Sequence, residues 1–253
     1  MAKQVYWLSD AEWQRIEPLL PRGRRGAHRV DDRRVISGIV HMLRCGARWR
    51  DCPEVYGPYT TVYNRFNRWS RQGIWTDIFY ALTGSTGMYG AASVDSTYIK
   101  AHRSAAGAKG GPFNNAIGRS RGGQTTKIHA LTDEIGRPYA LLITAGNVHD
   151  LDGARRLLTL GHRPKSVIAD RAYDARSLRE ELAQRRIKAV IPPNPTRKHP
   201  HRYDKRAYKG RNVIERMFCR LKDFRRIATR YDKRADIFLS AILLTAALLW
   251  WLN

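Results

Sequence analysis

The chain has 253 residues, with 46 Lys and Arg against 22 Asp and Glu, and a formal net charge of +24 at pH 7. This length allows two folded units, and this charge favours a polyanionic partner such as nucleic acid over a merely basic, soluble protein. The three cysteines form no CxxC pair and the first residues show no signal-peptide pattern, which argues against a disulfide framework, a zinc site and secretion. We expect a cytoplasmic protein.

The first helix is predicted within LSDAEWQRIEPLLP, where Ser9 and Glu12 have the spacing of a capping box. Pro21 is expected to end it. A second amphipathic helix should begin after Asp32 and stop near Gly46, because its apolar residues recur at helical spacing.

A third helix is predicted in YTTVYNRFNRWSRQG, with two distinct faces. One face is apolar and carries Val62, Phe66 and Trp69. The other carries hydrogen-bond donors at the same spacing, namely Asn64, Arg68 and Arg71. Three short helices of which the last displays Asn and Arg are typical of a helix-turn-helix DNA reader, so these three residues are candidate DNA-binding residues. An ordinary solvated helix face is the alternative.

GSTGMYGAAS, residues 84–93, is rich in turn-forming residues and should join two units: a helical DNA-binding domain at 1–85 and a catalytic domain at 91–253. Five short β-branched runs follow: SVDSTYIKAH, TKIHALTD, PYALLITAG, SVIAD and KAVIPP. Helical patterns at 152–160 and 177–186 separate the later runs. This order predicts a mixed α/β sheet. Between the first two runs lies a glycine-rich basic loop, which we expect to be mobile without its ligand.

The apolar run at 237–252 has no charged residue. Its 16 residues fall short of the roughly 20 that a membrane-spanning helix needs. We expect a buried terminal helix and no membrane partner, with a membrane tether as the alternative.

Two aspartates occupy costly positions in the predicted sheet. Asp95 interrupts the first strand, and Asp170 ends the otherwise apolar run SVIAD. A buried carboxylate needs a partner, which can be a basic side chain or a bound cation. For each aspartate alone, a strand-end acid that caps a turn or pairs with Arg is an equally good interpretation.

A third acid, Glu215, lies in the basic stretch YKGRNVIERMFCRLK. At about 100° per residue, four polar residues of this helix share a stripe about 60° wide: Tyr208, Arg211, Glu215 and Lys222. The apolar residues gather on another face, so the stripe can line a cleft. The alternative is an exposed helix that an Arg211–Glu215 pair stabilises by a few tenths of a kcal/mol.

Together these motifs resemble the DDE transposases of bacterial insertion sequences, above all the insertion sequence five family within the group that also contains the insertion sequence four family. The likeness is carried by Asp95 in VDST, Asp170 in ADRAYD and the spacing Y-x2-R-x3-E-x6-K, and it covers nearly the whole chain. Unlike some relatives, the chain has only PNPTRKHPHRYDKRA before the glutamate helix, in place of a large inserted β domain.

The resemblance implies an α/β, RNase H-like catalytic domain preceded by a small all-α, helix-turn-helix-like domain. Asp95, Asp170 and Glu215 are its implied catalytic and metal-binding residues, with Tyr208, Arg211 and Lys222 contacting DNA. Two Mg²⁺ ions, about 3.5 to 4 Å apart, can neutralise charge on the attacking and leaving oxygens of a phosphodiester, and Mn²⁺ is a possible substitute.

The implied partners are double-stranded DNA, at element ends and target, and further copies of the chain in a homodimer or higher oligomer. The implied location is the bacterial cytoplasm, at the nucleoid. A non-catalytic, sequence-specific DNA-binding regulator is the alternative function. His149 and Asp150 in GNVHD could bear on the site, although an ordinary loop turn is the favoured interpretation.

Overall fold

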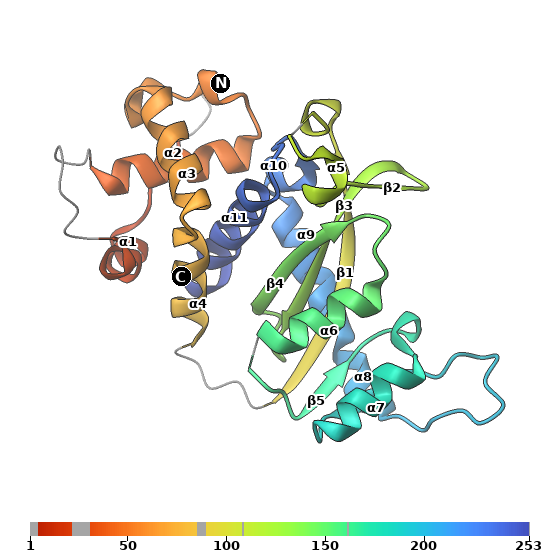
Figure 1. Cartoon of the computed structure of the whole chain (residues 1–253). Helices are drawn as coiled ribbons and strands as arrows, with labels where there is room; N and C mark the ends of the chain where they lie inside the picture. Colours follow the sequence, from red (N-terminus) through yellow and green to blue (C-terminus); the bar gives the residue numbers. More distant parts are fainter. Residues whose placement is uncertain (1–4, 22–30, 85–89, 108, 161, 253) are drawn as a thin grey trace. The chain divides into compact units, whose positions relative to one another are not determined.

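The computed structural model describes residues 5–21, 31–84, 90–107, 109–160 and 162–252 (Figure 1). Contacts divide the chain into two compact units. The helical unit comprises 1–85, 102–108 and 221–253, and the sheet unit comprises 86–101 and 109–220. In this grouping, residues 102–108 and the C-terminal segment 221–253 belong with the N-terminal helices, whereas the expected division placed both in the second unit. Half of the predicted linker, residues 85–89, lies outside the described residues, and its last three residues already belong to the first strand.

The helices of the helical unit are α1 (Asp10–Ile16), α2 (Asp32–Cys45), α3 (Tyr59–Arg71), α4 (Ile74–Gly84), α10 (Arg225–Ala228) and α11 (Ala235–Ala246). The predicted capping box is confirmed: the Ser9 hydroxyl accepts the Glu12 N–H, and the Glu12 carboxylate accepts the Ser9 N–H at 2.6 Å. The expected end at Pro21 was wrong. The helix stops at Ile16, because a 3₁₀ turn that contains Pro18 follows it.

Helix α3 has the two faces that its sequence predicts. Val62, Phe66 and Trp69 are buried, whereas Asn64, Arg68 and Arg71 are exposed. Helix α4, which the sequence interpretation missed, contacts α3 and α11. The apolar terminal segment is the buried helix α11, continued by a π-helical turn at Ala247–Trp251. In the described part of the chain, no helix is both long and apolar enough to cross a membrane.

The sheet unit contains β1 (Ala91–Ala101), β2 (Gly118–Ser120), β3 (Gly123–Thr132), β4 (Pro138–Ala145), β5 (Ser166–Ile168) and β6 (Lys188–Val190). They run in the order β2-β3-β1-β5-β6, and β4 pairs with β3. Strand β3 pairs in antiparallel orientation with both β1 and β4. Strand β5 pairs in parallel orientation with both β1 and β6. The mixed sheet and its five predicted runs are therefore confirmed.

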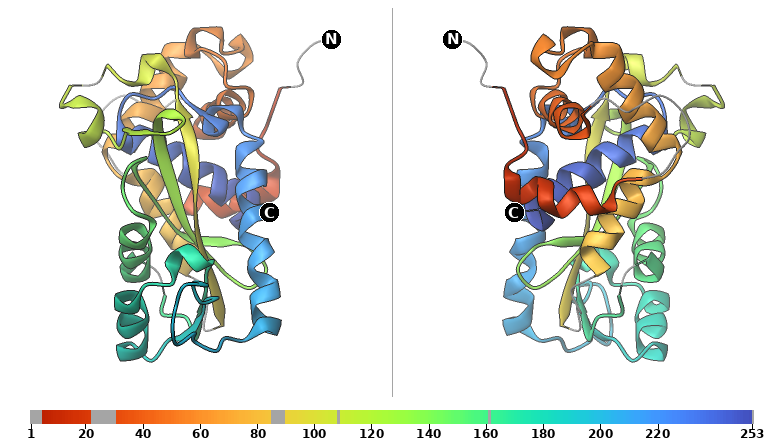
Figure 2. Two further views of the ribbon diagram at one scale, coloured as in Figure 1. Left: turned by 90° about the vertical axis from the view of Figure 1, so that its right-hand side faces the viewer. Right: turned by 90° about the vertical axis from the view of Figure 1, so that its left-hand side faces the viewer.

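Helices cover both faces of this sheet (Figure 2). Helices α6 (Asp150–Leu160) and α7 (Arg176–Gln184) lie on one side, and α9 (Asn212–Lys222) lies on the other. On α6, Gly153 approaches His129 of β3 so closely that no side chain fits there. The short α8 (Lys205–Tyr208) precedes α9, and the glycine-rich loop contains α5 (Gly111–Asn114) and strand β2.

Candidate active site

The register of two parallel strands brings the predicted aspartates together. Ser93 of β1 pairs with Ile168 of β5, and each aspartate follows its strand residue by two positions. Asp95 lies within β1 and Asp170 lies just after the end of β5, so the two are at the same level of neighbouring strands, which are about 4.8 Å apart. The interruption of two apolar runs by acids was the sequence signal for this pair.

Asp95 is largely buried, with 20% of its side chain exposed. Its Oδ1 accepts the N–H of Ser96 at 2.7 Å, and its Oδ2 accepts a hydrogen bond from Arg211 at 3.3 Å. The pKa of Asp95 is raised to about 6, with burial as the largest cause. The charges of Asp170 and Glu215 contribute to this rise, and the Ser96 N–H and Arg211 oppose it. The other two acids thus lie close enough to act on Asp95.

Asp170 caps the 3₁₀ turn Arg171–Tyr173 that follows β5, and its Oδ1 accepts the N–H of Ala172 at 2.9 Å. This capping role matches the turn-capping interpretation, which does not exclude a second role as a ligand. Tyr173 at the end of the turn is 2% exposed, and its hydroxyl has no hydrogen-bond partner among the described residues. Burial raises the pKa of Tyr173, and Asp95 raises it further.

Glu215 is linked to Asp95 by the Arg211 side chain, which contacts both acids. One terminal nitrogen of the Arg211 guanidinium donates to Glu215 Oε1 at 2.5 Å, and the other donates to Asp95 at 3.3 Å. The i,i+4 pair of the alternative interpretation therefore exists, but it is not confined to the helix surface. It joins the helix to a strand residue 116 positions earlier in the chain.

Two other members of the polar stripe differ in what they contact. Tyr208 ends α8, and its ring centroid lies 5.9 Å from the Cζ of Arg211. Lys222 ends α9, two turns beyond Glu215, in the segment that belongs to the helical unit. Arg211 itself lies in a 3₁₀ turn, Lys209–Arg211, that separates α8 from α9.

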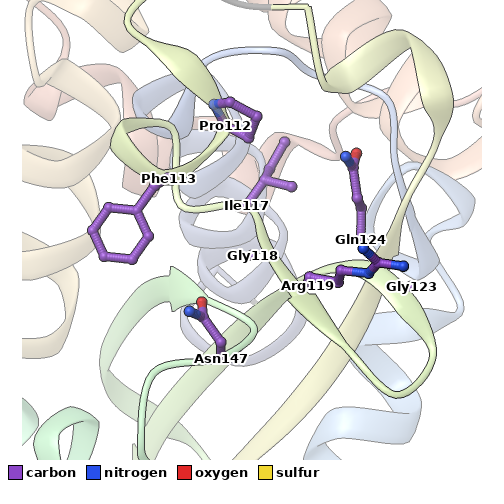
Figure 3. A pocket seen from close by; sticks show the side chains of 8 residues that line it. All are labelled: Pro112, Phe113, Ile117, Gly118, Arg119, Gly123, Gln124 and Asn147. Carbon is purple, nitrogen blue, oxygen red and sulfur yellow. The ribbon is translucent and has the colours of Figure 1, made fainter.

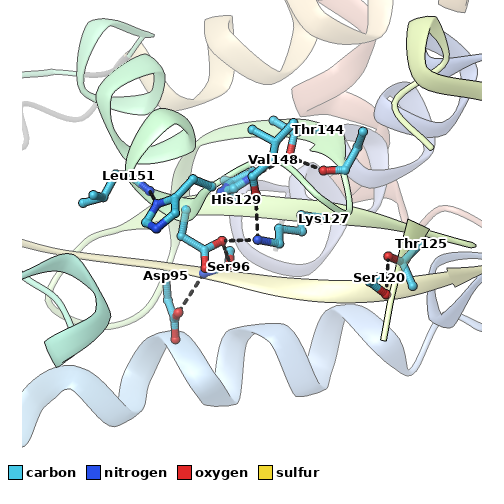
Figure 4. A network of polar contacts seen from close by, with 12 residues as sticks. Asp95, Ser96, Ser120, Thr125, Lys127, His129, Thr144, Val148 and Leu151 are labelled. Atoms are coloured by element: carbon cyan, nitrogen blue, oxygen red, sulfur yellow. Dashed lines mark hydrogen bonds and ion pairs between the residues drawn. The ribbon is translucent and has the colours of Figure 1, made fainter. Parts of the chain in front are cut away.

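A second polar cluster lies on the other face of β1 (Figure 4). Asp150 at the start of α6 accepts a hydrogen bond from Ser96 Oγ at 2.6 Å and pairs with Lys127 Nζ at 2.9 Å. Lys127 also donates to the Val148 carbonyl at 2.8 Å. The ordinary-turn interpretation was wrong for Asp150. A lysine within the apolar run TKIHALTD was the signal that could have revealed its partner.

Two histidines lie near this cluster. His129 is fully buried, its Nε2 lies 2.8 Å from the Thr144 hydroxyl, and burial lowers its pKa to about 4. His149 accepts the N–H of Leu151 through Nδ1 at 3.2 Å, so the turn interpretation is confirmed for this residue.

Two open pockets flank the β2–β3 hairpin. The pocket in Figure 3 has a volume of about 620 Å³, and its lining includes the exposed Phe113 together with Arg119, Gln124 and Asn147. A neighbouring pocket of about 740 Å³ is bordered by Tyr98, Arg121, Lys127 and His149 among others. Both combine aromatic and basic side chains, the types that contact bases and phosphates in nucleic-acid complexes.

The three acids suit Mg²⁺ in kind, because this ion takes hard oxygen ligands and few of them from protein. Among the described residues, however, no three Asp, Glu, His or Cys side chains are gathered closely enough to hold one ion. Asp95 and Asp170 are neighbours, whereas Glu215 is paired with Arg211. The donor set fits the metal, but the Arg211 guanidinium is bonded to two of its three members, Asp95 and Glu215.

Comparisons with known proteins identify the family of the chain. A family described as putative transposase of IS4/5 family matches residues 8–79, and a transposase DDE domain matches residues 86–250. The putative transposase for insertion sequence element IS6501 of Brucella ovis is 41% identical over 131 residues, which cover 50% of this chain and 98% of that protein. The putative transposase for IS402 of Burkholderia cepacia is 34% identical over 154 residues, covering 56% and 69%.

Among solved structures, the piggyBac transposase synaptic complex with hairpin DNA matches with a TM-score of 0.51 and 9% identity, covering 96% of this chain and 72% of that one. At this identity the likeness concerns the fold alone, and it supports an RNase H-like sheet preceded by helices. From the acids on the sheet, the matched domains and the relatives, we conclude that the chain belongs to the IS4/5 family of DDE transposases of insertion sequences.

Proposed function

We propose that this chain binds the terminal inverted repeats of its element, cuts DNA at the element's ends by metal-dependent hydrolysis, and joins the freed 3′-hydroxyl to target DNA. One observation carries the proposal. Asp95 and Asp170 stand at the same level of two parallel strands, and Arg211 links Glu215 to that pair.

Asp95, Asp170 and Glu215 would hold two Mg²⁺ ions, or Mn²⁺ in their place. When bound, the ions supply positive charge for the attacking and leaving oxygens of the phosphodiester. The protein itself positions the carboxylates. The Ser96 N–H of β1 orients the Asp95 carboxylate, and the Ala172 N–H of the turn after β5 orients that of Asp170, so a backbone group holds each acid.

DNA is attracted by the basic C-terminal third. Residues 197–234 contain fifteen Lys and Arg against four Asp and Glu, which should make binding fall steeply with salt. Tyr208, Arg211 and Lys222 are assigned to phosphates near the acids. The exposed face of α3, with Asn64, Arg68 and Arg71, is assigned to the inverted repeats. The pockets beside the β2–β3 hairpin offer a further surface for DNA next to the site.

Pairing two element ends requires two copies of the active site, so the working form is a homodimer or a higher oligomer on DNA. Its substrate places the protein in the bacterial cytoplasm, at the nucleoid. No membrane partner is needed for either chemical step.

The test is Asp170→Asn, which removes a ligand charge while keeping the side chain's size. Cleavage of end DNA in Mg²⁺ should fall by more than the roughly 10- to 100-fold that loss of an outer-shell group costs, while DNA binding stays close to that of the wild type. Asp152→Asn is the matched control, because Asp152 is 58% exposed on α6. Undiminished cleavage by Asp170→Asn would overturn the assignment.

Removal of Mg²⁺ separates this function from that of a non-catalytic regulator. A transposase should bind end DNA in EDTA but cut it only after Mg²⁺ is restored. A protein that binds the ends and never cuts them, with or without metal, would be the regulator.

A further inference from the structure

One contact in the sheet unit that the proposed function leaves unexplained is the bridge that Arg211 forms between two acids. Its guanidinium donates from one terminal nitrogen to Asp95 Oδ2 and from the other to Glu215 Oε1, at 3.3 and 2.5 Å. The Arg211 side chain is 22% exposed, so this bridge is partly shielded from water. Charge-assisted hydrogen bonds of this kind are stronger than neutral ones.

The bridge takes up one carboxylate oxygen each of Asp95 and Glu215, two acids that a metal ion would need as ligands. Asp95 Oδ1 already accepts the Ser96 N–H, and Arg211 is bonded to Oδ2. A divalent ion bound to Asp95 and Glu215 would lie beside a positive guanidinium, and the two like charges would repel each other. The bridge also agrees with the absence of any three-ligand metal cluster among the described residues.

A DNA phosphate is the natural competitor for Arg211, because a guanidinium binds phosphate and carboxylate oxygens with the same planar fork. Arg211 also lies where the backbone can change. The 3₁₀ turn Lys209–Arg211 separates α8 from α9, and such turns within a helical stretch often mark hinges. A small adjustment there would redirect the side chain without moving strand β1.

We propose that Arg211 is a latch, meaning a side chain that neutralises Asp95 and Glu215 in the free protein and releases them when a DNA phosphate takes its place. This inference rests on the proposed function. It adds an order of events, in which DNA binds first and the metal ions bind tightly only afterwards. A transposase built in this way holds no assembled metal site until an element end is present.

The test measures Mn²⁺ binding to the full chain by the loss of the free-ion electron paramagnetic resonance signal, in the absence of DNA. Arg211→Gln should bind Mn²⁺ at least about tenfold more tightly than the wild type, a size typical of coupling between sites. Arg216→Gln removes the same charge from an exposed position of α9 and should leave Mn²⁺ affinity unchanged. Equal affinities of wild type and Arg211→Gln would overturn the latch.

A second measurement adds metal-free duplex DNA that carries the inverted repeat flanking the coding sequence. Wild-type affinity for Mn²⁺ should rise with DNA, whereas that of Arg211→Gln should change little because its acids are already free. Arg211→Lys keeps the charge but lacks the planar fork whose two terminal nitrogens contact the two acids. It should fall between wild type and Arg211→Gln, and it serves if Arg211→Gln does not fold.

The failures can be told apart. Wild-type protein that cuts DNA in Mg²⁺, but gains no Mn²⁺ affinity from DNA or from Arg211→Gln, disproves the latch and leaves the proposed function standing. Absence of both cleavage and Mn²⁺ binding, in wild type and variants alike, disproves the metal-dependent function together with the latch.

Discussion

The two faces of strand β1 differ in how they stabilise the charge of the acids that lie on them. On the side of α9, Asp95 is buried next to Asp170, and its pKa is raised to about 6. On the side of α6, Asp150 is held by Ser96 and Lys127, and desolvation is outweighed so that its pKa is lowered. On the α9 face, acids of like charge lie close together. On the α6 face, the carboxylate has hydrogen-bond and ion-pair partners. Acids brought together in this way, with their repulsion only partly offset by Arg211, are expected at functional sites.

The largest effect on stability should come from removing the ion pair on the α6 face. Lys127→Met leaves Asp150 half-buried without its cation, which should lower the free energy of unfolding by about 3 kcal/mol or more. Urea denaturation followed by circular dichroism measures this loss. Lys100→Met is the control, because Lys100 is exposed on β1. Equal losses for both variants would show that the α6 face is not the structural one.

The next effect is a pH dependence from the same face. The pKa of His129 is lowered to about 4 by burial, so the unfolded chain binds a proton that the folded chain does not between about pH 6.5 and 4. Stability should fall by about 3 kcal/mol as the pH drops through this window. His129→Gln should remove that part of the fall, measured by denaturation at each pH, whereas the exposed His201→Gln should not. Parallel curves for wild type and His129→Gln would refute the assignment.

The smallest effect on stability should come from the α9 face, where a substitution is expected to stabilise the fold. Asp95→Asn removes a buried negative charge beside two other acids, so in EDTA at pH 8 it should raise the free energy of unfolding by about 1 to 3 kcal/mol. Folded Asp95 binds a proton more readily than unfolded Asp95, so wild-type stability falls as the pH rises from about 4 to about 6. The variant should lack this fall. A destabilised variant would mean that the pair with Arg211 outweighs the repulsion.

Local pattern predicted most of the elements. The alternating and β-branched runs became β1, β3, β4, β5 and β6, and the capping box at Ser9 starts α1. These features depend on neighbours within a few residues, whose spacing determines which side chains share a face. The helix end at Ile16 and the additional helix α4 were missed, because turn geometry and packing partners decide element boundaries.

The candidate site was predictable only in part. Asp95, Asp170 and Glu215 stood out as acids in apolar or basic surroundings, but nothing near Asp150 in the sequence indicates that its carboxylate would meet Ser96, 54 positions earlier. Tyr173 likewise appears as a plain aromatic residue, although its hydroxyl is buried beside the acids. Both depend on where α6 and the turn after β5 pack.

The amino-acid sequence alone determined which residues carry charge, which runs are apolar, and that Arg211 and Glu215 share one helical stripe. Only the tertiary structure decided that this stripe reaches Asp95, and that one guanidinium joins two acids far apart in the chain. The reason is physical: spacing along a helix follows from fixed backbone geometry, whereas a contact across 116 positions depends on the register of the sheet and on the packing of a helix against it.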